Sequence, residues 1–183
     1  MADRLRTRSA LAGTGPLSSP VLQLHEVLDS RIVHLEAART GEALDTFIAQ
    51  FGPRSLPQPG RFASSAGTVL IPTGPAAWLC VGAAPDPAAF ALAVDVSGAW
   101  TQLLIAGSAA TALLAKGCAL DLHPAHFPPG ACAAAGFVRL RTIIWRPQFD
   151  RFHMLVGRSY TRALWEWLED AAAEFEIVPG VTE

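Results

Sequence analysis

The apolar residues of this chain lie in short runs of five to nine residues, and most of these runs end at a glycine or a proline. A helix that crosses a membrane needs about 20 apolar residues, so these runs are far too short for that role. Their length and their content of valine, isoleucine and aromatic residues are typical of β-strands. The sequence therefore predicts a fold built on short strands, at residues 30–37, 66–72, 77–82, 100–106, 138–146 and 152–156.

Helical patterns lie between and after these strands. In residues 41–51, apolar side chains recur with the spacing of one helix face, at Leu44, Phe47, Ile48 and Phe51. Further helices are predicted at residues 85–90, 109–116 and 159–176. Each half of the chain then follows the order β-α-β-β-α, which is a repeat of elements without a repeat of residue identities.

The repeated order predicts an α+β fold in which two β-α-β-β-α half-domains pack together as one compact unit. The first 22 residues mix Arg, Ser, Gly and Pro without periodicity, so residues 1–22 are predicted to be a flexible N-terminal arm. The first half-domain is then assigned to residues 23–92 and the second to residues 93–183.

The charge balance excludes a general nucleic-acid binder. The 183 residues include 14 Lys and Arg against 16 Asp and Glu, a net charge of −2, so the basic field that such binding needs is missing. Three cysteines do not make a disulfide framework, and the start of the chain lacks the apolar core of a secretory signal. We expect a cytoplasmic protein with no nucleic-acid or membrane partner. With only 16% charged residues, the chain either buries an unusual share of itself or covers some surface with a partner.

No pattern in the sequence predicts catalysis by this chain. It contains neither a G-x-S-x-G nucleophile motif nor a G-x-x-x-x-G-K-[ST] phosphate loop. We therefore assign no catalytic, cofactor-binding or metal-binding residue. One alternative is a small metal-binding domain, because Cys and His are zinc ligands and four of them lie close together in sequence. Their C-x4-H-x2-H-x5-C spacing matches no common zinc pattern, and they are Cys118, His123, His126 and Cys132.

The last predicted helix contains a tryptophan at the edge of its polar face. Trp165 lies beside Arg162 and Glu169 when the helix is drawn at 100° per residue. Two interpretations remain open from the sequence. The indole ring is either half-buried over the rim of the helix, or it is an anchor in a protein–protein interface, where tryptophan is enriched.

Several segments carry a family resemblance. Residues 114–129 read L-A-K-G-C-A-L-D-L-H-P-A-H-F-P-P and resemble the signature of the gamma subunit of heterotetrameric sarcosine oxidase. The strand and helix at 151–175, the V-D-V-S at 94–97 and the G-P-A-A-W-L at 74–79 are similar to other parts of that family. The R-P-Q-F-D link at 146–150 departs from the family pattern.

The resemblance implies a small, non-catalytic subunit of a flavoenzyme complex. In that family, four different chains (alpha, beta, gamma and delta) oxidatively demethylate sarcosine to glycine, with hydrogen peroxide and formaldehyde or 5,10-methylenetetrahydrofolate. FAD, FMN, NAD and tetrahydrofolate are carried mainly on or between the larger chains, and zinc is carried on the smallest. The family fold is similar to part of the folate-binding aminomethyltransferase fold. Two alternatives are a subunit of a related N-methyl amino acid dehydrogenase and a stand-alone folate-binding protein.

The signature suggests a docking element. We expect Gly117 to end a helix with a positive φ, and Asp121 to accept backbone N–H groups and fix the loop that follows. The hypothesis is that this loop is a rigid docking knob for a larger subunit. The candidate interface residues are Lys116, Gly117, Cys118, Asp121, His123, Pro124 and Trp165.

Overall fold

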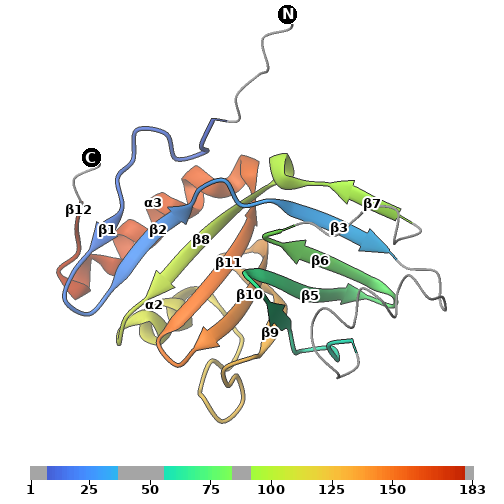
Figure 1. The fold of residues 1–183 in the computed structure, drawn as a ribbon. Helices are drawn as coiled ribbons and strands as arrows, with labels where there is room; N and C mark the ends of the chain where they lie inside the picture. The colour runs from blue at the N-terminus through green and yellow to red at the C-terminus, as the bar shows by residue number, and fades with distance from the viewer. Residues whose placement is uncertain (1–7, 37–55, 84–91, 180–183) are drawn as a thin grey trace, which may run out of the picture.

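The structure is a computed structural model that describes residues 8–36, 56–83 and 92–179 (Figure 1). The helices predicted at 41–51 and 85–90 lie outside the described residues. Within the described ranges the chain forms one sheet of seven strands, one sheet of five strands and two α-helices. The expected mixture of sheet and helix is confirmed at this level, with sheet as the larger part. Among the described residues, no helix is long and apolar enough to cross a membrane.

The seven-stranded sheet has the order β12-β1-β2-β8-β11-β10-β9, and every neighbouring pair is antiparallel. Its strands are β1 (Leu17–Ser18), β2 (Gln23–Val27), β8 (Trp100–Ala106), β9 (Cys132–Phe137), β10 (Leu140–Gln148), β11 (Arg151–Gly157) and β12 (Val178–Pro179). β1 comes from the segment predicted to be an arm. From residue 8 onward that segment is described, and it buries Leu11, Leu17 and Leu22 in the core.

The five-stranded sheet has the order β4-β5-β6-β3-β7 and is also antiparallel throughout. Its strands are β3 (Ile32–Glu36), β4 (Ala63–Ser65), β5 (Thr68–Gly74), β6 (Ala77–Val81) and β7 (Leu92–Asp95). Between β5 and β6 the chain reverses at Gly74–Ala77, at the junction of the strands predicted at residues 66–72 and 77–82.

Both sheets contain four strands in the same order, and each half of the chain also contributes one strand to the sheet of the other half. β3-β6-β5-β4 in one sheet corresponds to β8-β11-β10-β9 in the other. The strand that precedes each set joins the opposite sheet: β2 pairs with β8, and β7 pairs with β3. The chain therefore crosses between the sheets twice, at residues 28–31 and at residues 96–99, and the two halves are joined through their sheets.

Two layers of side chains hold these parts together. Between the sheets, Ile71 and Leu79 of the smaller sheet share a buried cluster with Trp145 and Leu155 of the larger one. On its other face the larger sheet packs against α2 (Ala110–Gly117) and α3 (Thr161–Ala172), which lie together behind it in Figure 1. Short 3-10 helices precede β8 and flank α3, at Ser97–Ala99, Arg158–Tyr160 and Ala173–Phe175.

Candidate functional site

Lys116, the first of the candidate interface residues, joins the two helices. Its ammonium group donates a hydrogen bond to the carbonyl oxygen of Ala171 at 2.6 Å and forms an ion pair with Glu174. It also lies 5.0 Å from the centre of the Phe175 ring, within range of a cation–π contact. A cation is favourable here because the carbonyl groups at a helix C-terminus are partially negative. Lys116 therefore fixes the end of α2 against the end of α3.

Position 117 requires a glycine, but the reason differs from the predicted one. The expected positive φ is wrong: Gly117 is the last residue of α2, and it is absent from the described glycines with positive φ. Instead, a Cβ atom at this position would lie 2.6 Å from Cζ of Phe137 and 2.9 Å from Cη2 of Trp167. These two rings pack edge to face, 5.2 Å apart. Close packing, not backbone conformation, excludes a larger residue.

Trp165 is a correction to the candidate interface. The sequence placed it at the rim of the polar face, but only 2% of it is exposed and it lies in the core between α3 and the larger sheet. The helix turns this side chain inward because α3 packs on the sheet over a wider face than a single apolar stripe. A side chain buried in its own core cannot anchor a partner, so Trp165 is removed from the interface set.

After α2 the signature loop, defined here as residues 118–131, runs to β9 and projects from the body of the fold (Figure 1). Cys118 begins it with a backbone bridge to Phe137, and its Sγ accepts the N–H of Leu120 at 3.4 Å. Buried and exposed side chains then alternate along the loop. Leu122 and Phe127 are buried, whereas the two histidines between them are exposed, His123 and His126.

Asp121 organises the exposed part of the signature loop, as the sequence predicted. Its Oδ1 accepts the backbone N–H of His123 at 2.9 Å, and its Oδ2 lies 2.5 Å from Nδ1 of His126. These hydrogen bonds, with the one to the His123 N–H first, hold the pKa of Asp121 below its usual value. The backbone N–H groups of His126 and Phe127 both bond to the carbonyl of His123, which closes a tight turn.

The residue that fixes the loop from below is Arg146, which sequence reasoning did not select. Its side chain is only 2% exposed, and Nη1 donates to the carbonyl oxygens of Leu122 at 2.9 Å and Phe127 at 2.8 Å. Nε donates to the carbonyl of Phe149 at 3.1 Å, and the guanidinium lies 4.7 Å from the ring of Phe152. Burial lowers its pKa, opposed by the charge of Asp150. The sequence feature that could have identified Arg146 is its position at the end of the apolar run in I-I-W-R-P.

The four side chains of the metal alternative do not come together. Cys132 is buried in the layer between the sheets, where desolvation raises the pKa of its thiol to about 11. His123 and His126 lie on the exposed side of the loop. No group of three or more His, Cys, Asp or Glu side chains in the described ranges is arranged to hold a metal ion.

A second region lies where the chain crosses between the sheets. The V-D-V-S segment, residues 94–97, fixes this crossing: Oγ of Ser97 accepts the N–H of Ile32 at 2.8 Å and donates to Asp95 at 2.7 Å. Asp95 also lies 3.5 Å from Nε of Arg31. Its hydrogen bonds with Ser97, more than the charge of Arg31, lower its pKa. The segment thus ties the start of β3 to the start of β8.

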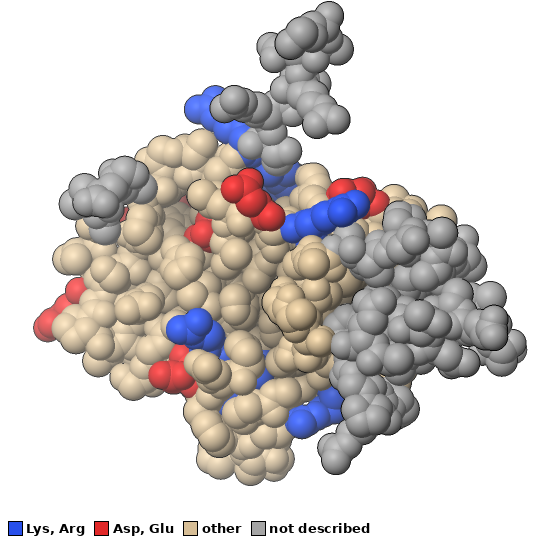
Figure 2. All heavy atoms as spheres, viewed as in Figure 1, with Lys and Arg blue, Asp and Glu red and all other residues tan. Residues whose placement is uncertain are grey.

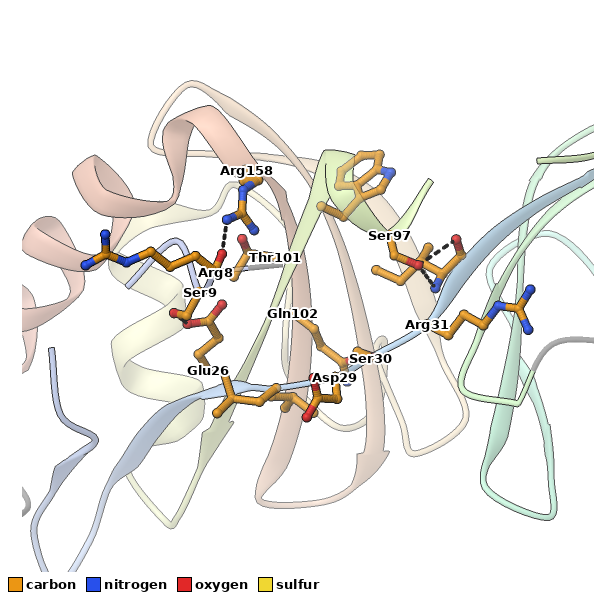
Figure 3. Close-up of a pocket in the computed structure, with 14 residues that line it drawn as sticks. Arg8, Ser9, Glu26, Asp29, Ser30, Arg31, Ser97, Thr101, Gln102 and Arg158 are labelled. Atoms are coloured by element: carbon orange, nitrogen blue, oxygen red, sulfur yellow. Dashed lines mark hydrogen bonds between the residues drawn. The ribbon is translucent and has the colours of Figure 1, made fainter. Parts of the chain in front are cut away.

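Beside this crossing is a polar cavity of about 260 Å³, which we call the crossing cavity (Figure 3). β2 leaves the larger sheet after Val27, which pairs with Gln102, so β8 extends past β2 by Trp100 and Thr101. The cavity occupies that end of the sheet. Its charged and polar lining residues are Arg8, Ser9, Glu26, Asp29, Ser30, Arg31, Ser97, Thr101, Gln102 and Arg158.

A chain of polar side chains runs from the crossing cavity into the layer between the sheets. Ser30 donates to the side-chain oxygen of Gln102, whose amide nitrogen lies 2.9 Å from Nδ1 of His153. The His153 ring stacks on Trp145 at 4.9 Å. Desolvation, with smaller contributions from the positive charges of Arg151 and His25, lowers the pKa of His153 to about 4. This ring is therefore neutral near pH 7.

The chain is similar in sequence to gamma subunits of sarcosine oxidase. Residues 68–174 match the sequence model of the family described as "Sarcosine oxidase, gamma subunit family". Sarcosine oxidase subunit gamma of Corynebacterium sp. (strain P-1) is 26% identical over 201 residues, which covers 88% of this chain and 98% of that protein. The subunit gamma of an Arthrobacter species is 26% identical over 165 residues, covering 83% and 80%.

A solved structure has the same fold. It is the heterotetrameric sarcosine oxidase from Corynebacterium sp. U-96 in complex with pyrrole 2-carboxylate, one chain of which superimposes with a TM-score of 0.79. The match covers 96% of this chain and 99% of that one at 24% identity, a level at which the likeness is one of fold.

Proposed function

This chain belongs to the sarcosine oxidase gamma subunit family, and from that premise we propose that it is the small, non-catalytic subunit of a sarcosine-oxidase-type flavoenzyme complex. The complex oxidatively demethylates sarcosine to glycine, with hydrogen peroxide and formaldehyde or 5,10-methylenetetrahydrofolate as the other products. In this proposal FAD, FMN, NAD and tetrahydrofolate are carried mainly on or between the larger chains, and zinc is carried on the smallest. The observation that carries the proposal is the family match over residues 68–174, which includes the whole signature.

The proposal assigns the partners and the setting. The chain joins alpha, beta and delta subunits in the cytoplasm, and residues 23–92 and 93–183 act as one compact unit. Its fold corresponds to part of the folate-binding aminomethyltransferase fold, without the catalytic role. The scarcity of charge supports a subunit that is covered by partners: on the face drawn in Figure 2 the charged side chains are scattered, and most of the described surface carries neither sign.

Within this proposal the signature loop is the docking element. Lys116, Gly117 and Cys118 form its base, and the exposed turn that begins at Asp121 presents His123 and Pro124. Arg146 and Asp121 hold the backbone of the loop in one arrangement before any partner arrives. A preorganised loop loses little conformational freedom on binding, which favours tight association.

A tagged pull-down of the full chain from native extract tests both levels of the proposal. We expect two or three larger chains with flavin absorbance to purify with it. Asp121→Ala and His123→Ala should reduce that yield several-fold, because they remove exposed groups of the docking turn. Glu169→Ala, an exposed carboxylate on α3, is the matched control and should not change the yield.

The two ways of failing are distinct. A wild-type chain that purifies alone and colourless contradicts the subunit assignment. A wild-type chain that brings down the flavoprotein, together with variants that do so equally well, contradicts only the role of the signature loop.

A further inference from the structure

The crossing cavity contains a buried hydroxyl group without a partner. Among the described residues, Oγ1 of Thr101 is fully enclosed and makes no hydrogen bond. Thr101 as a whole is 3% exposed and lines the cavity, where Figure 3 shows it close to Arg158. Buried polar groups in folded proteins are nearly always hydrogen-bonded, because an unpaired one costs stability. A ligand that supplied an acceptor would satisfy this hydroxyl.

The backbone that lines the same cavity is strained. Asp29 has a φ of 55°, in the left-handed region that residues other than glycine rarely adopt. It belongs to the crossing segment between β2 and β3, and it lines the cavity together with Ser30. Strained backbone of this kind concentrates at binding and catalytic sites. The strain and the unpaired hydroxyl are independent features of one place.

Opposite charges lie at the two ends of the cavity. Figure 3 shows Arg158 beside Thr101 at one end, and Glu26 and Asp29 toward the other. Arg158 donates one hydrogen bond to the backbone carbonyl of Arg8, and its guanidinium group has other N–H donors available. Glu26 accepts a hydrogen bond from Ser9 on one of its two oxygens. The side chains of Arg8 and Arg31 point away from the space between these ends in Figure 3.

The N-terminal segment closes one wall of the cavity. Leu11 is buried in the main core, and the N–H and hydroxyl of Thr14 bond to its carbonyl at 2.8 Å and 2.6 Å. Oγ of Ser9 also accepts the N–H of Leu11 at 2.9 Å. The wall that carries Arg8 and Ser9 is therefore fixed by the fold, so the site is formed before a ligand binds.

We propose that the crossing cavity binds a small zwitterion of the amino acid class. Its carboxylate accepts hydrogen bonds from Arg158 and Thr101, and its ammonium group faces Glu26 and Asp29. This arrangement pairs each charge of the ligand with the opposite charge of the protein and satisfies the unpaired hydroxyl. The proposal is independent of the proposed function, because a chain that failed to join a flavoenzyme complex would still contain this site.

Titration calorimetry of the full chain with glycine, acetate and methylamine is the test. We expect glycine to bind, and acetate and methylamine to bind at least about tenfold more weakly, because each offers only one of the two charges. Arg158→Gln and Thr101→Val should each weaken glycine binding roughly tenfold or more. Arg162→Gln, an exposed arginine one turn along α3, is the matched control and should leave the affinity unchanged.

Thr101→Val also separates binding from folding. Because it removes a hydroxyl that has no partner, we expect the free energy of unfolding to stay the same or to rise, while glycine affinity falls. If the chain purifies only with partner subunits, the same titration is made on the complex, and the difference between wild type and variant isolates this site. The proposal is overturned if glycine releases no heat, if acetate binds as tightly as glycine, or if Thr101→Val and Arg158→Gln bind glycine like wild type.

Discussion

The signature loop and the crossing cavity use polar groups in opposite ways. In the loop, the donors of Arg146 and the acceptors of Asp121 are matched by groups of the same chain. In the cavity, the hydroxyl of Thr101 is buried and unmatched among the described residues. A satisfied network gives a rigid shape that a partner can recognise. An unsatisfied group leaves hydrogen-bonding capacity for a ligand, at a cost to the stability of the free protein.

The largest expected effect comes from removing Arg146, the buried arginine under the signature loop. Arg146→Met leaves the buried carbonyl groups of Leu122 and Phe127, and the partly buried carbonyl group of Phe149, without their donor. We expect the free energy of unfolding to fall by about 3–5 kcal/mol, since each unsatisfied buried group costs about 1–3 kcal/mol. Urea denaturation followed by circular dichroism measures this loss.

Arg146→Lys is the matched control for that experiment. It keeps the positive charge but loses the planar fork that reaches several carbonyls at once, so we expect it to recover only part of the stability. A loss below about 1 kcal/mol in Arg146→Met would mean that the loop does not depend on its buried arginine.

A second change tests the packing at the base of the loop. Gly117→Ala places a methyl group against the rings of Phe137 and Trp167, 2.6 Å and 2.9 Å from their nearest atoms. We expect a destabilisation of about 1–3 kcal/mol, which is typical of an overpacked core. Gly98→Ala is the control, because a Cβ there meets nothing within 4 Å. Equal thermal midpoints for the two variants would contradict the packing explanation.

The smallest expected effect concerns His153, which is hydrogen-bonded to Gln102 of the crossing cavity. The pKa of His153 is lowered to about 4 in the folded protein, so the neutral ring is favoured by folding. Its contribution to stability is complete above about pH 6.5 and decreases as the pH falls from there toward 4. We expect a loss of roughly 1–2 kcal/mol over that range, after a discount for the partial exposure of the ring.

The measurement is the free energy of unfolding of wild type and His153→Gln between pH 4 and pH 7. Subtracting the two curves removes the carboxylates and His25, which titrate in both proteins. A difference that stays constant with pH would show that His153 titrates alike in the folded and unfolded chains.

Prediction from sequence succeeded where a strand has a strong local pattern. Residues 100–106 were predicted as a strand and form β8 with the same bounds, and the pair at 138–146 and 152–156 corresponds to β10 and β11. It failed for β9, because the alanines and glycine of Cys132–Phe137 have low strand propensity and the strand depends on its pairing with β10. β1, β2, β4 and β12 were also missed. The first two lie in or next to the segment predicted to be an arm.

Of the candidate site, the sequence located the signature and the role of Asp121. It assigned Gly117 a backbone reason and Trp165 a place at the rim, and both were wrong because packing between separate elements decides them. Arg146 and Thr101 were not selected. Their importance depends on which buried groups surround them in the folded chain, and a local sequence pattern does not show those neighbours.

The sequence by itself determined the family and the strands with a strong local pattern, since each of these depends on residues close together along the chain. Only the tertiary structure decided that the halves exchange β2 and β7 between the sheets, that Arg146 lies beneath the signature loop and that a polar cavity forms at the crossing. These features join residues far apart in sequence, so their energies come from burial and hydrogen bonds that exist only once the chain has folded.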